Sequence, residues 1–366
     1  MSTVHKGYGH HLRTRSINAL IIAAVCIAII IISALIIHLV IFPSSKYNNA
    51  LDAMNSGNYI KAVYEFVELD DYKASLENTI VCLEQIYNVD LSYATTTAIS
   101  PWWVITSDGQ LSFDQNTYDG DGNISIPSVV DGIIVTAIAE YGFSNSYEIT
   151  SVEIPETVTE LHEGAFHYCT ALQSVSFPNS LTSIGDSAFF SNMSLKFIEL
   201  PSTLSKLGSG AFENCVNLTS VNIPRRLTVV PTSAFSGCAS LKSVTFDGST
   251  KKISESAFSG CTALSDICLP DSVEHIGVGA FKNCTSITSM AIPPSAFELG
   301  KSAFYGCTAL SELHLPVSIS LIDTNTFYGC SSLQTIYYSG TQSEWDAIVV
   351  VTDNAPFITA NVVFEQ

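Results

Sequence analysis

One pattern of apolar and polar positions repeats along most of this chain with a period of 23 residues. Phenylalanine recurs nine times at this interval without a break, at Phe143, Phe166, Phe189, Phe212, Phe235, Phe258, Phe281, Phe304 and Phe327. Counted from each Phe, Leu or Ile follows at position +6, and apolar residues return at +9 and +11. Pro stands at +12 in seven of the nine repeats. Equal intervals of this kind indicate one structural unit that the fold repeats.

The spacing within each repeat predicts a short strand. Because side chains alternate between the two faces of a strand, positions +9 and +11 point inward, and +8 and +10 point outward. Pro has no N–H, so +12 ends the pairing at the same place in every coil. We expect the chain to turn back at a second apolar pair, such as Leu181 and Ile184, and each coil to end at a pair such as Ala188-Phe189. No unit can bury its apolar positions alone, so we predict a stack of coils with one parallel ladder of strands about 4.8 Å apart.

The pattern L-x-x-[IV]-x-[ILF]-P…I-G-x-x-A-F-x-x-C resembles the BspA-type leucine-rich repeats. Residues 241–246, 276–277 and 280–284 carry it most clearly, and the resemblance extends over about residues 102–350. It implies a repeat solenoid over residues 102–336, mainly β with short irregular or helical returns. Residues 124–143 resemble the first unit of the family, stretched by about five residues in 128–132. The resemblance also implies a C-terminal cap over 337–366, around Tyr337, Trp345 and Ile348.

An uncharged apolar segment precedes the repeats. Residues 17–42 contain 26 residues without Asp, Glu, Lys or Arg, enough for a helix of about 39 Å that crosses a bilayer. The alternatives are a buried helix of a soluble protein and a cleaved signal peptide, whose apolar part is shorter and ends in small residues. We predict a transmembrane signal-anchor. Lys6, Arg13 and Arg15 make residues 1–16 a basic cytoplasmic tail, so that the rest is extracellular.

A short helical module is predicted for residues 46–90, between the anchor and the repeats. Ala50, Gly57, Tyr59, Ala62 and Phe66 have the spacing of two helices joined by a turn. This segment resembles a single tetratricopeptide repeat, in which small residues let two helices approach closely. A stalk or spacer and a peptide-binding groove are both compatible with it.

The net charge of the chain and the positions of its cysteines limit the partners and the chemistry that we expect. Lys+Arg 15 against Asp+Glu 34 give a formal charge of −19, which argues against a nucleic-acid partner because such proteins need a basic surface. Cys occurs at +3 in seven repeats. Residues in one register point the same way, so we predict a column of buried thiols rather than disulfides, which need converging Cβ atoms. Cys268 stands at the outward position +10 and is expected to be exposed.

No motif predicts an enzyme, a cofactor or a metal site. The chain has no phosphate loop, nucleophile elbow or zinc helix. Residues 119–123 resemble the start of a calcium loop, but Ile124 stands where that loop requires Gly, and Val130 where it requires Glu. We therefore expect a polar turn at these residues and a non-enzymatic protein.

The candidate binding surface is the outward side of the predicted ladder, which we call the ladder face. It consists of positions +8 and +10, which are mostly small and polar, with Phe197 and Tyr337 as aromatic anchors of the kind that dominate interfaces. The candidate binding residues on it are Ser174, Ser176, Phe197, Glu199, Ser220, Asn222, Asp266, Glu312, His314 and Tyr337. The alternative is that these are ordinary solvated strand residues that keep a flat ladder soluble.

The resemblance implies a surface or secreted protein, since some members of the family are adhesins. We therefore expect a membrane-anchored extracellular protein that binds a protein or glycan on a cell surface through the ladder face. The lipid bilayer is its second partner, through residues 17–42. The alternative is a structural scaffold at the cell's own envelope, in which the helical module contacts a membrane partner.

Overall fold

The computed structural model of the chain describes residues 50, 52–56, 62, 102–116, 118, 120–130 and 133–365. The predicted basic tail and the predicted signal-anchor lie outside these residues. Within the described part of the chain, no helix is long and apolar enough to cross a membrane. Of the predicted helical module, residues 50, 52–55 and 62 are helical. Ala50, Ala53 and Ala62 are buried and Ser56 is in a turn; the rest of this module lies outside the described residues.

The described part that follows divides into two compact units. The smaller unit includes residues 102–116 and the described part of 127–136. Strands β1 (Trp103–Ile105) and β2 (Gln110–Phe113) form an antiparallel hairpin, and so do β4 (Val129–Val130) and β5 (Ile133–Ile134). The turn between β1 and β2 requires Gly109, whose φ is +84° and whose added Cβ would lie 2.4 Å from the Ile134 carbonyl oxygen. Val129 and Val130, in the stretch that lengthens the first repeat, are therefore paired as a short antiparallel strand.

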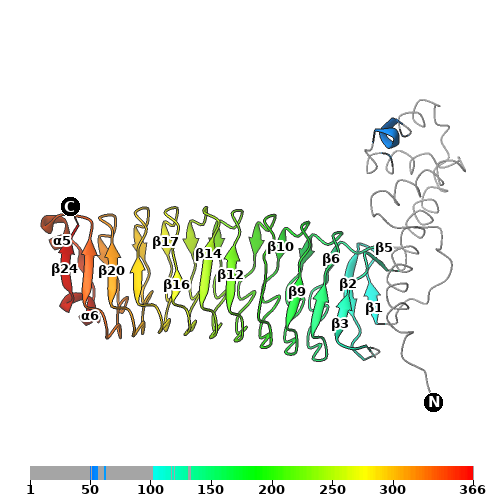
Figure 1. Ribbon diagram of the computed structural model, residues 1–366, viewed down its shortest axis with the longest axis horizontal. Helices are drawn as coiled ribbons and strands as arrows, with labels where there is room; N and C mark the ends of the chain where they lie inside the picture. Colours follow the sequence, from blue (N-terminus) through cyan, green and yellow to red (C-terminus); the bar gives the residue numbers. More distant parts are fainter. Residues whose placement is uncertain are drawn as a thin grey trace, which may run out of the picture. The chain divides into compact units, whose positions relative to one another are not determined.

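The larger unit, residues 118–126 and 137–365, is a β-solenoid (Figure 1). The strands of its first ladder are parallel and fall into three consecutive sheets. The first sheet contains β3 (Asn123–Ser125), β7 (Ser151–Glu153) and β9 (Ser174–Ser176); the second contains β12 (Ser220–Ile223), β14 (Ser243–Phe246) and β16 (Asp266–Ile267); the third contains β18 (Ser289–Ala291), β20 (Glu312–Leu315), β22 (Thr335–Tyr338) and β24 (Asn361–Phe364). Between regular coils the partners are 23 residues apart, as in Ser220 with Ser243. The predicted parallel pairing and its 23-residue register are confirmed, but the ladder is interrupted between β9 and β12 and between β16 and β18.

A second ladder forms where the sequence predicted only a return of the chain. Its strands are β6 (Ala137–Ile138), β8 (Glu160–Leu161), β10 (Ser183–Ile184), β11 (Lys206–Leu207), β13 (Val229–Val230), β15 (Lys252–Ile253), β17 (His275–Ile276), β19 (Glu298–Leu299), β21 (Leu321–Ile322) and β23 (Val349–Val350). Each has two residues, too few for a periodic pattern in the sequence. Their pairing is parallel, as in Ile253 with Ile276.

The turns that carry the Phe residues form the third side of each coil. The Phe166 N–H donates to the Ala188 carbonyl of the next coil at 2.7 Å, and the later coils repeat this bond. The residue two positions before each Phe and the residue two positions after it have a positive φ. The residues before are Tyr141, Gly164, Ser187, Gly210, Ser233, Ser256, Gly279, Ser302 and Asn325, and those after are Asn145, Tyr168, Ser191, Asn214, Gly237, Gly260, Asn283, Gly306 and Gly329. Only some of these are Gly, so each coil holds backbone strain that its hydrogen bonds to the next coil offset.

The nine Phe rings form one column through the centre of the solenoid. All are fully buried, and successive ring centroids are between 4.8 and 5.6 Å apart. The seven cysteines at +3 lie beside this column as free, buried thiols, which confirms their predicted state. Each thiol donates to the carbonyl of the Phe in the preceding coil, as Cys238 does to Phe212 at 3.2 Å. Thiols and rings therefore tie neighbouring coils together.

The C-terminal end of the column is closed by two residues that the sequence analysis did not identify. Phe357, in α6 (Ala355–Thr359), stacks on Phe327 at 5.3 Å as a further ring. The buried Asn354 replaces the carbonyl of a following coil, because its Oδ1 accepts from the Phe327 N–H at 2.9 Å. Trp345, in α5 (Gln342–Asp346), covers Phe357 at 5.4 Å. Side chains thus complete the contacts that another coil would make.

Removing one ring should destabilise the whole stack. Phe235→Ala would leave a cavity in the middle of the column, and we expect it to lower the free energy of unfolding by about 3–5 kcal/mol. Phe297→Ala, at a ring that is 55% exposed, is the matched control and should change it by less than about 1 kcal/mol. Urea denaturation followed by circular dichroism measures both. Equal effects would contradict the role of the column.

Asn192 interrupts the thiol column and offers a stabilising substitution. It is fully buried, and neither its Nδ2 nor its Oδ1 has a hydrogen-bond partner. Asn192→Cys would restore the thiol of the other coils and remove two unsatisfied polar atoms, so unfolding should cost about 1–3 kcal/mol more. The reverse change, Cys238→Asn, should destabilise by a similar amount. The same denaturation experiment checks both, and a destabilising N192C would refute this account of the site.

Candidate binding face

The candidate binding residues lie on the outer surface of the first ladder, as the alternation predicts. Seven of them are exposed: Ser174, Ser176, Phe197, Glu199, Ser220, Asp266 and Glu312. Asn222, His314 and Tyr337 are half-buried. The inward neighbours Val175, Val221 and Leu313 are buried. The ladder brings the candidates onto one face, but it spreads them along the coils rather than gathering them into one cleft.

Phe197 is the most prominent apolar group on the ladder face. Its side chain is 64% exposed, and other coils hold Ser at this position, for example Ser174 and Ser220. Phe197 forms a single parallel bridge with Ser174 and lies outside the regular strands. The ring therefore stands where the regular pairing of the ladder is interrupted, between β9 and β12.

Tyr337 differs from the exposed anchor that the sequence predicted. Its ring stacks on His314 of the preceding coil with a centroid distance of 4.6 Å and an angle of 14°. His314 in turn places Nδ1 3.7 Å from Glu365 Oε1. These contacts leave Tyr337 half-buried, because an imidazole at the same register covers one face of the ring. Phe197 is thus the better exposed of the two anchors.

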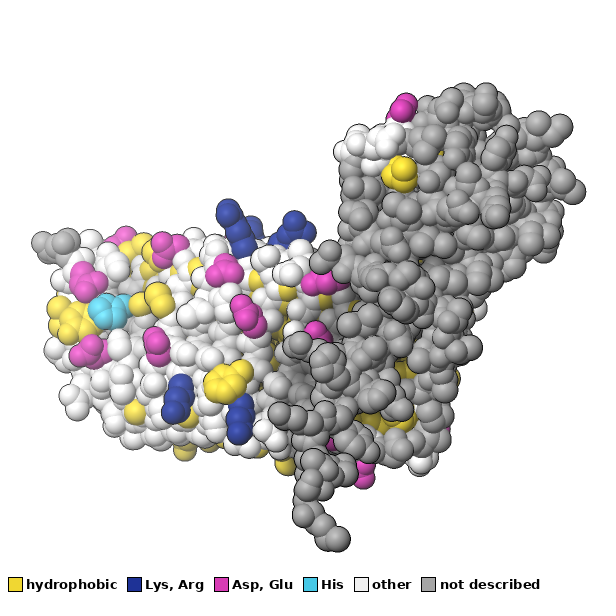
Figure 2. Space-filling view, turned by 45° about the vertical axis from the view of Figure 1, so that its right-hand side comes forward, with side chains coloured by type: hydrophobic (Ala, Val, Ile, Leu, Met, Phe, Trp, Pro, Cys, Tyr) yellow, Lys and Arg dark blue, Asp and Glu magenta, His cyan; other side chains and the backbone are white. Residues whose placement is uncertain are grey.

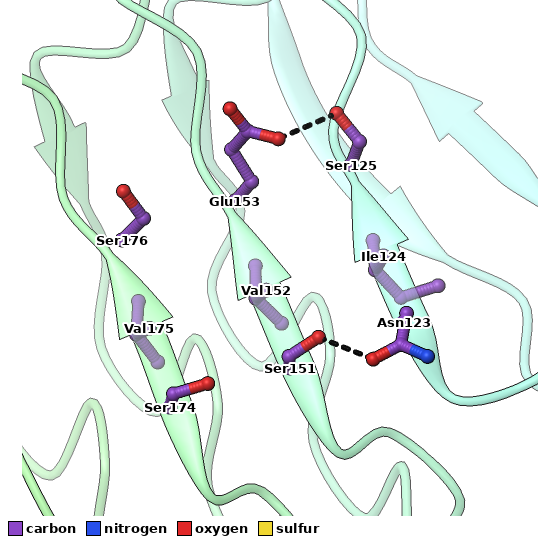
Figure 3. Close-up of a pocket in the computed structure, with 9 residues that line it drawn as sticks. All are labelled: Asn123, Ile124, Ser125, Ser151, Val152, Glu153, Ser174, Val175 and Ser176. Carbon is purple, nitrogen blue, oxygen red and sulfur yellow. Dashed lines mark hydrogen bonds between the residues drawn. The ribbon is translucent and has the colours of Figure 1, made fainter. Parts of the chain in front are cut away.

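A shallow hollow occupies the N-terminal part of the ladder face, over β3, β7 and β9 (Figure 3). Its floor is formed by Ile124, Val152 and Val175, and its rims by the outward polar residues of these strands. Ser151 donates to Asn123 Oδ1 at 2.7 Å, and Ser125 donates to Glu153 Oε2 at 3.3 Å. Asn123 and Ser125 were not among the candidates, because the stretched first repeat displaces them from the 23-residue register. Their position in the sequence, between the polar turn and Ile126-Pro127, is the signal that could have identified them as outward residues of a strand.

The electrostatics of the ladder face are weakly acidic. Positions +8 and +10 hold Glu153, Glu199, Asp266 and Glu312 but no Lys or Arg. In the view of Figure 2, acidic and basic side chains are scattered among uncharged ones rather than gathered in one large patch. The face therefore offers hydrogen-bonding groups and one exposed ring, with a mild preference against anionic partners.

The described residues do not assemble a metal centre. No group of three or more His, Cys, Asp or Glu side chains converges among them. Asp121, in the segment that resembles a calcium loop, accepts the Asn123 N–H at 3.0 Å. This bond lowers the pKa of Asp121 and is the local bond of a polar turn.

Cys268 is expected to react with thiol reagents more readily than the seven buried cysteines of the column. Burial raises the pKa of Cys169, Cys215 and Cys261 to about 12, whereas Cys268 is exposed. Because the thiolate is the reactive form, we expect a maleimide at pH 7.5 to modify Cys268 in the native protein. The seven column thiols should react only after denaturation. Site-resolved mass spectrometry of these eight residues measures this, and rapid native labelling of the column would contradict its packing.

Comparison with known proteins places these observations in context. The sequence matches the family described as "BspA type Leucine rich repeat region", in six copies over residues 136–265 and 251–347. No curated protein matches the chain significantly.

The solved structures to which this chain is similar include leucine-rich repeat proteins. A leucine-rich repeat protein from Bacteroides ovatus is 28% identical, with a TM-score of 0.52 over 67% of this chain and 71% of its own. The T. pallidum leucine-rich repeat protein is 29% identical, with a TM-score of 0.45 over 52% and 90%. A leucine-rich cell surface protein from Faecalibacterium prausnitzii is 24% identical, with a TM-score of 0.36 over 69% and 97%.

Proposed function

Because this chain belongs to the BspA-type leucine-rich repeat family, we propose that it is a non-enzymatic binding protein whose ladder face docks a partner protein. The observation that carries this proposal is Phe197. An exposed ring at a position where other coils hold Ser lowers solubility and adds nothing to the core, so the need for a soluble ladder does not explain it. Aromatic side chains in this setting are typical interface anchors.

The surroundings of Phe197 define the partner that would fit. The same outward position in the two neighbouring coils holds Ser174 and Ser220, and the next outward residue of the Phe197 coil is Glu199, so hydroxyl and carboxylate groups occupy the adjacent register positions. A partner would insert an apolar pocket over Phe197 and pair with these polar groups at the rim, as interfaces commonly do. The rigid stacking of the coils means that little conformational entropy is lost on binding. A glycan could use the same hydroxyl-rich rows, and the experiment below distinguishes the two.

We further propose that the protein works at a cell surface. The support is the uncharged segment 17–42 with the basic residues before it, which favours a signal-anchor and an extracellular repeat domain. In that arrangement the ladder face is presented to neighbouring cells, and adhesion is the activity that follows. A partner in the same membrane would instead make the protein a scaffold of its own envelope.

The test is binding of the labelled full-length chain, kept in mild detergent, to intact cells of other kinds. We expect saturable binding that Phe197→Ala weakens by roughly tenfold or more, since a central aromatic anchor contributes about 2 kcal/mol. Glu199→Lys should also weaken it. Phe297→Ala, which removes a ring that is 55% exposed just before β19 of the second ladder, is the control and should bind normally.

Protease or glycosidase treatment of the cells identifies the class of partner. Loss of binding after protease treatment supports a protein, and loss only after glycosidase treatment supports a glycan. The absence of saturable binding, or equal loss in F197A and F297A, would overturn the assignment to the ladder face.

A further inference from the structure

A second surface, on the turn side of the solenoid, carries an exposed aromatic cluster: Tyr141, His167, Tyr168 and Phe190. Tyr141 and His167 meet edge to face at 5.8 Å, and His167 stacks on Phe190 at 5.1 Å. Tyr168 contacts both His167 and Phe190 at 4.5 and 5.4 Å. Tyr141 and Tyr168 are exposed and the other two are half-buried. These residues flank Phe143, Phe166 and Phe189 in the turns, so the cluster belongs to neither ladder.

The fold holds the ring of Tyr141 in place across two coils. The ring lies over Gly164, where an added Cβ would come within 2.2 Å of it. The Tyr141 hydroxyl donates to Glu163 Oε1 at 2.8 Å. Tyr141 itself has a positive φ of 52°, a conformation that a bulky residue adopts at a cost. Other coils have Gly at this register, for example Gly210 and Gly279, so the core does not require an aromatic residue here.

The coils that carry the cluster are acidic and contain no cation other than histidine. Residues 137–195 hold Glu140, Glu148, Glu153, Glu156, Glu160, Glu163 and Asp186, and neither Lys nor Arg. Three of these acids, Glu140, Glu163 and Asp186, occupy the same register in consecutive coils, beside the cluster, and all three are exposed. Burial lowers the pKa of His167, so its imidazole stays neutral at pH 7 and adds a ring face rather than a charge.

In the C-terminal coils, an aromatic ring on the same side of the solenoid is in contact with a Lys side chain of the chain itself. At the register of His167 and Phe190, three later coils hold Lys282, Tyr305 and Tyr328. Tyr305 and Tyr328 stack at 5.2 Å, and the Lys282 Nζ lies 5.2 Å from the centre of the Tyr305 ring. This is a cation–π contact within the chain. The N-terminal cluster has the rings but no Lys or Arg in its own coils.

We propose that the aromatic cluster is a docking site for the Arg and Lys side chains of a basic segment of a partner protein. Guanidinium groups stack on ring faces and pair with carboxylates, and here both groups lie next to each other on one rigid surface. The partner's cations would take the place that Lys282 occupies over Tyr305. The site is separate from the ladder face, so it does not depend on the function proposed for Phe197.

The test measures binding of a fluorescent Arg-rich peptide to the full-length protein by anisotropy at physiological salt. The ring variant combines Tyr141→Gly, Tyr168→Asn and Phe190→Ser, which are residues that other coils already hold at these registers. The net charge does not change. Since an exposed cation–π contact contributes about two- to fivefold in affinity, we expect the ring variant to bind at least fivefold more weakly. Circular dichroism establishes that the variant is folded.

Two further variants make the result decisive. Tyr305→Ser with Tyr328→Ser removes the two stacked rings, of which Tyr305 already has Lys282 of the same chain beside it, and it should leave the affinity for the peptide unchanged. Glu140→Gln with Glu163→Gln keeps the rings, and its weaker binding would show the contribution of the carboxylates. If the charge variant weakens binding while the ring variant does not, the peptide is held by the acidic surface in general and the proposal is wrong. It is equally wrong if the control pair or Phe197→Ala produces the main loss.

Discussion

The structure depends on stacking coils of equal length, so that each Phe ring lies directly over the ring of the preceding coil. The column buries nine rings, and each coil is tied to the next by backbone hydrogen bonds on its turn side and, in most coils, by strand pairing on the two ladders. A change in coil length moves side chains out of register on all three sides at once. The 23-residue period is therefore a geometric requirement of the stack.

Where the period is broken, the chain forms other structures. The lengthened first repeat pairs β3 with β7 at an offset of 28 residues, and Val129 and Val130 in the lengthened stretch pair with β5. At the other end β24 pairs with β22 at an offset of 26, within a cap that supplies Phe357 and Asn354. The C-terminal cap thus uses side chains in place of the missing coil, because an open end would expose apolar rings and unpaired backbone groups.

The same regularity shapes the surfaces available for binding. Since the core accepts only a few residue types at its inward positions, departures from the repeat at outward positions are free to serve recognition. Phe197 on the ladder face and the aromatic cluster on the turn side are departures of this kind. Both replace the Ser, Asn or Gly that other coils hold at the same register. A rigid stack keeps such side chains at fixed spacings, which suits a protein that binds other macromolecules.

The sequence by itself determined the stack, the first ladder, the inward and outward positions and the buried thiols, because period and alternation report directly on burial. It could not determine the two-residue strands of the second ladder, which are too short to show a period. Nor could it find that His314 covers Tyr337, or that Asn354 and Phe357 close the column. The aromatic cluster likewise joins residues from three coils. Such contacts are decided by which side chains the stacking brings together in space.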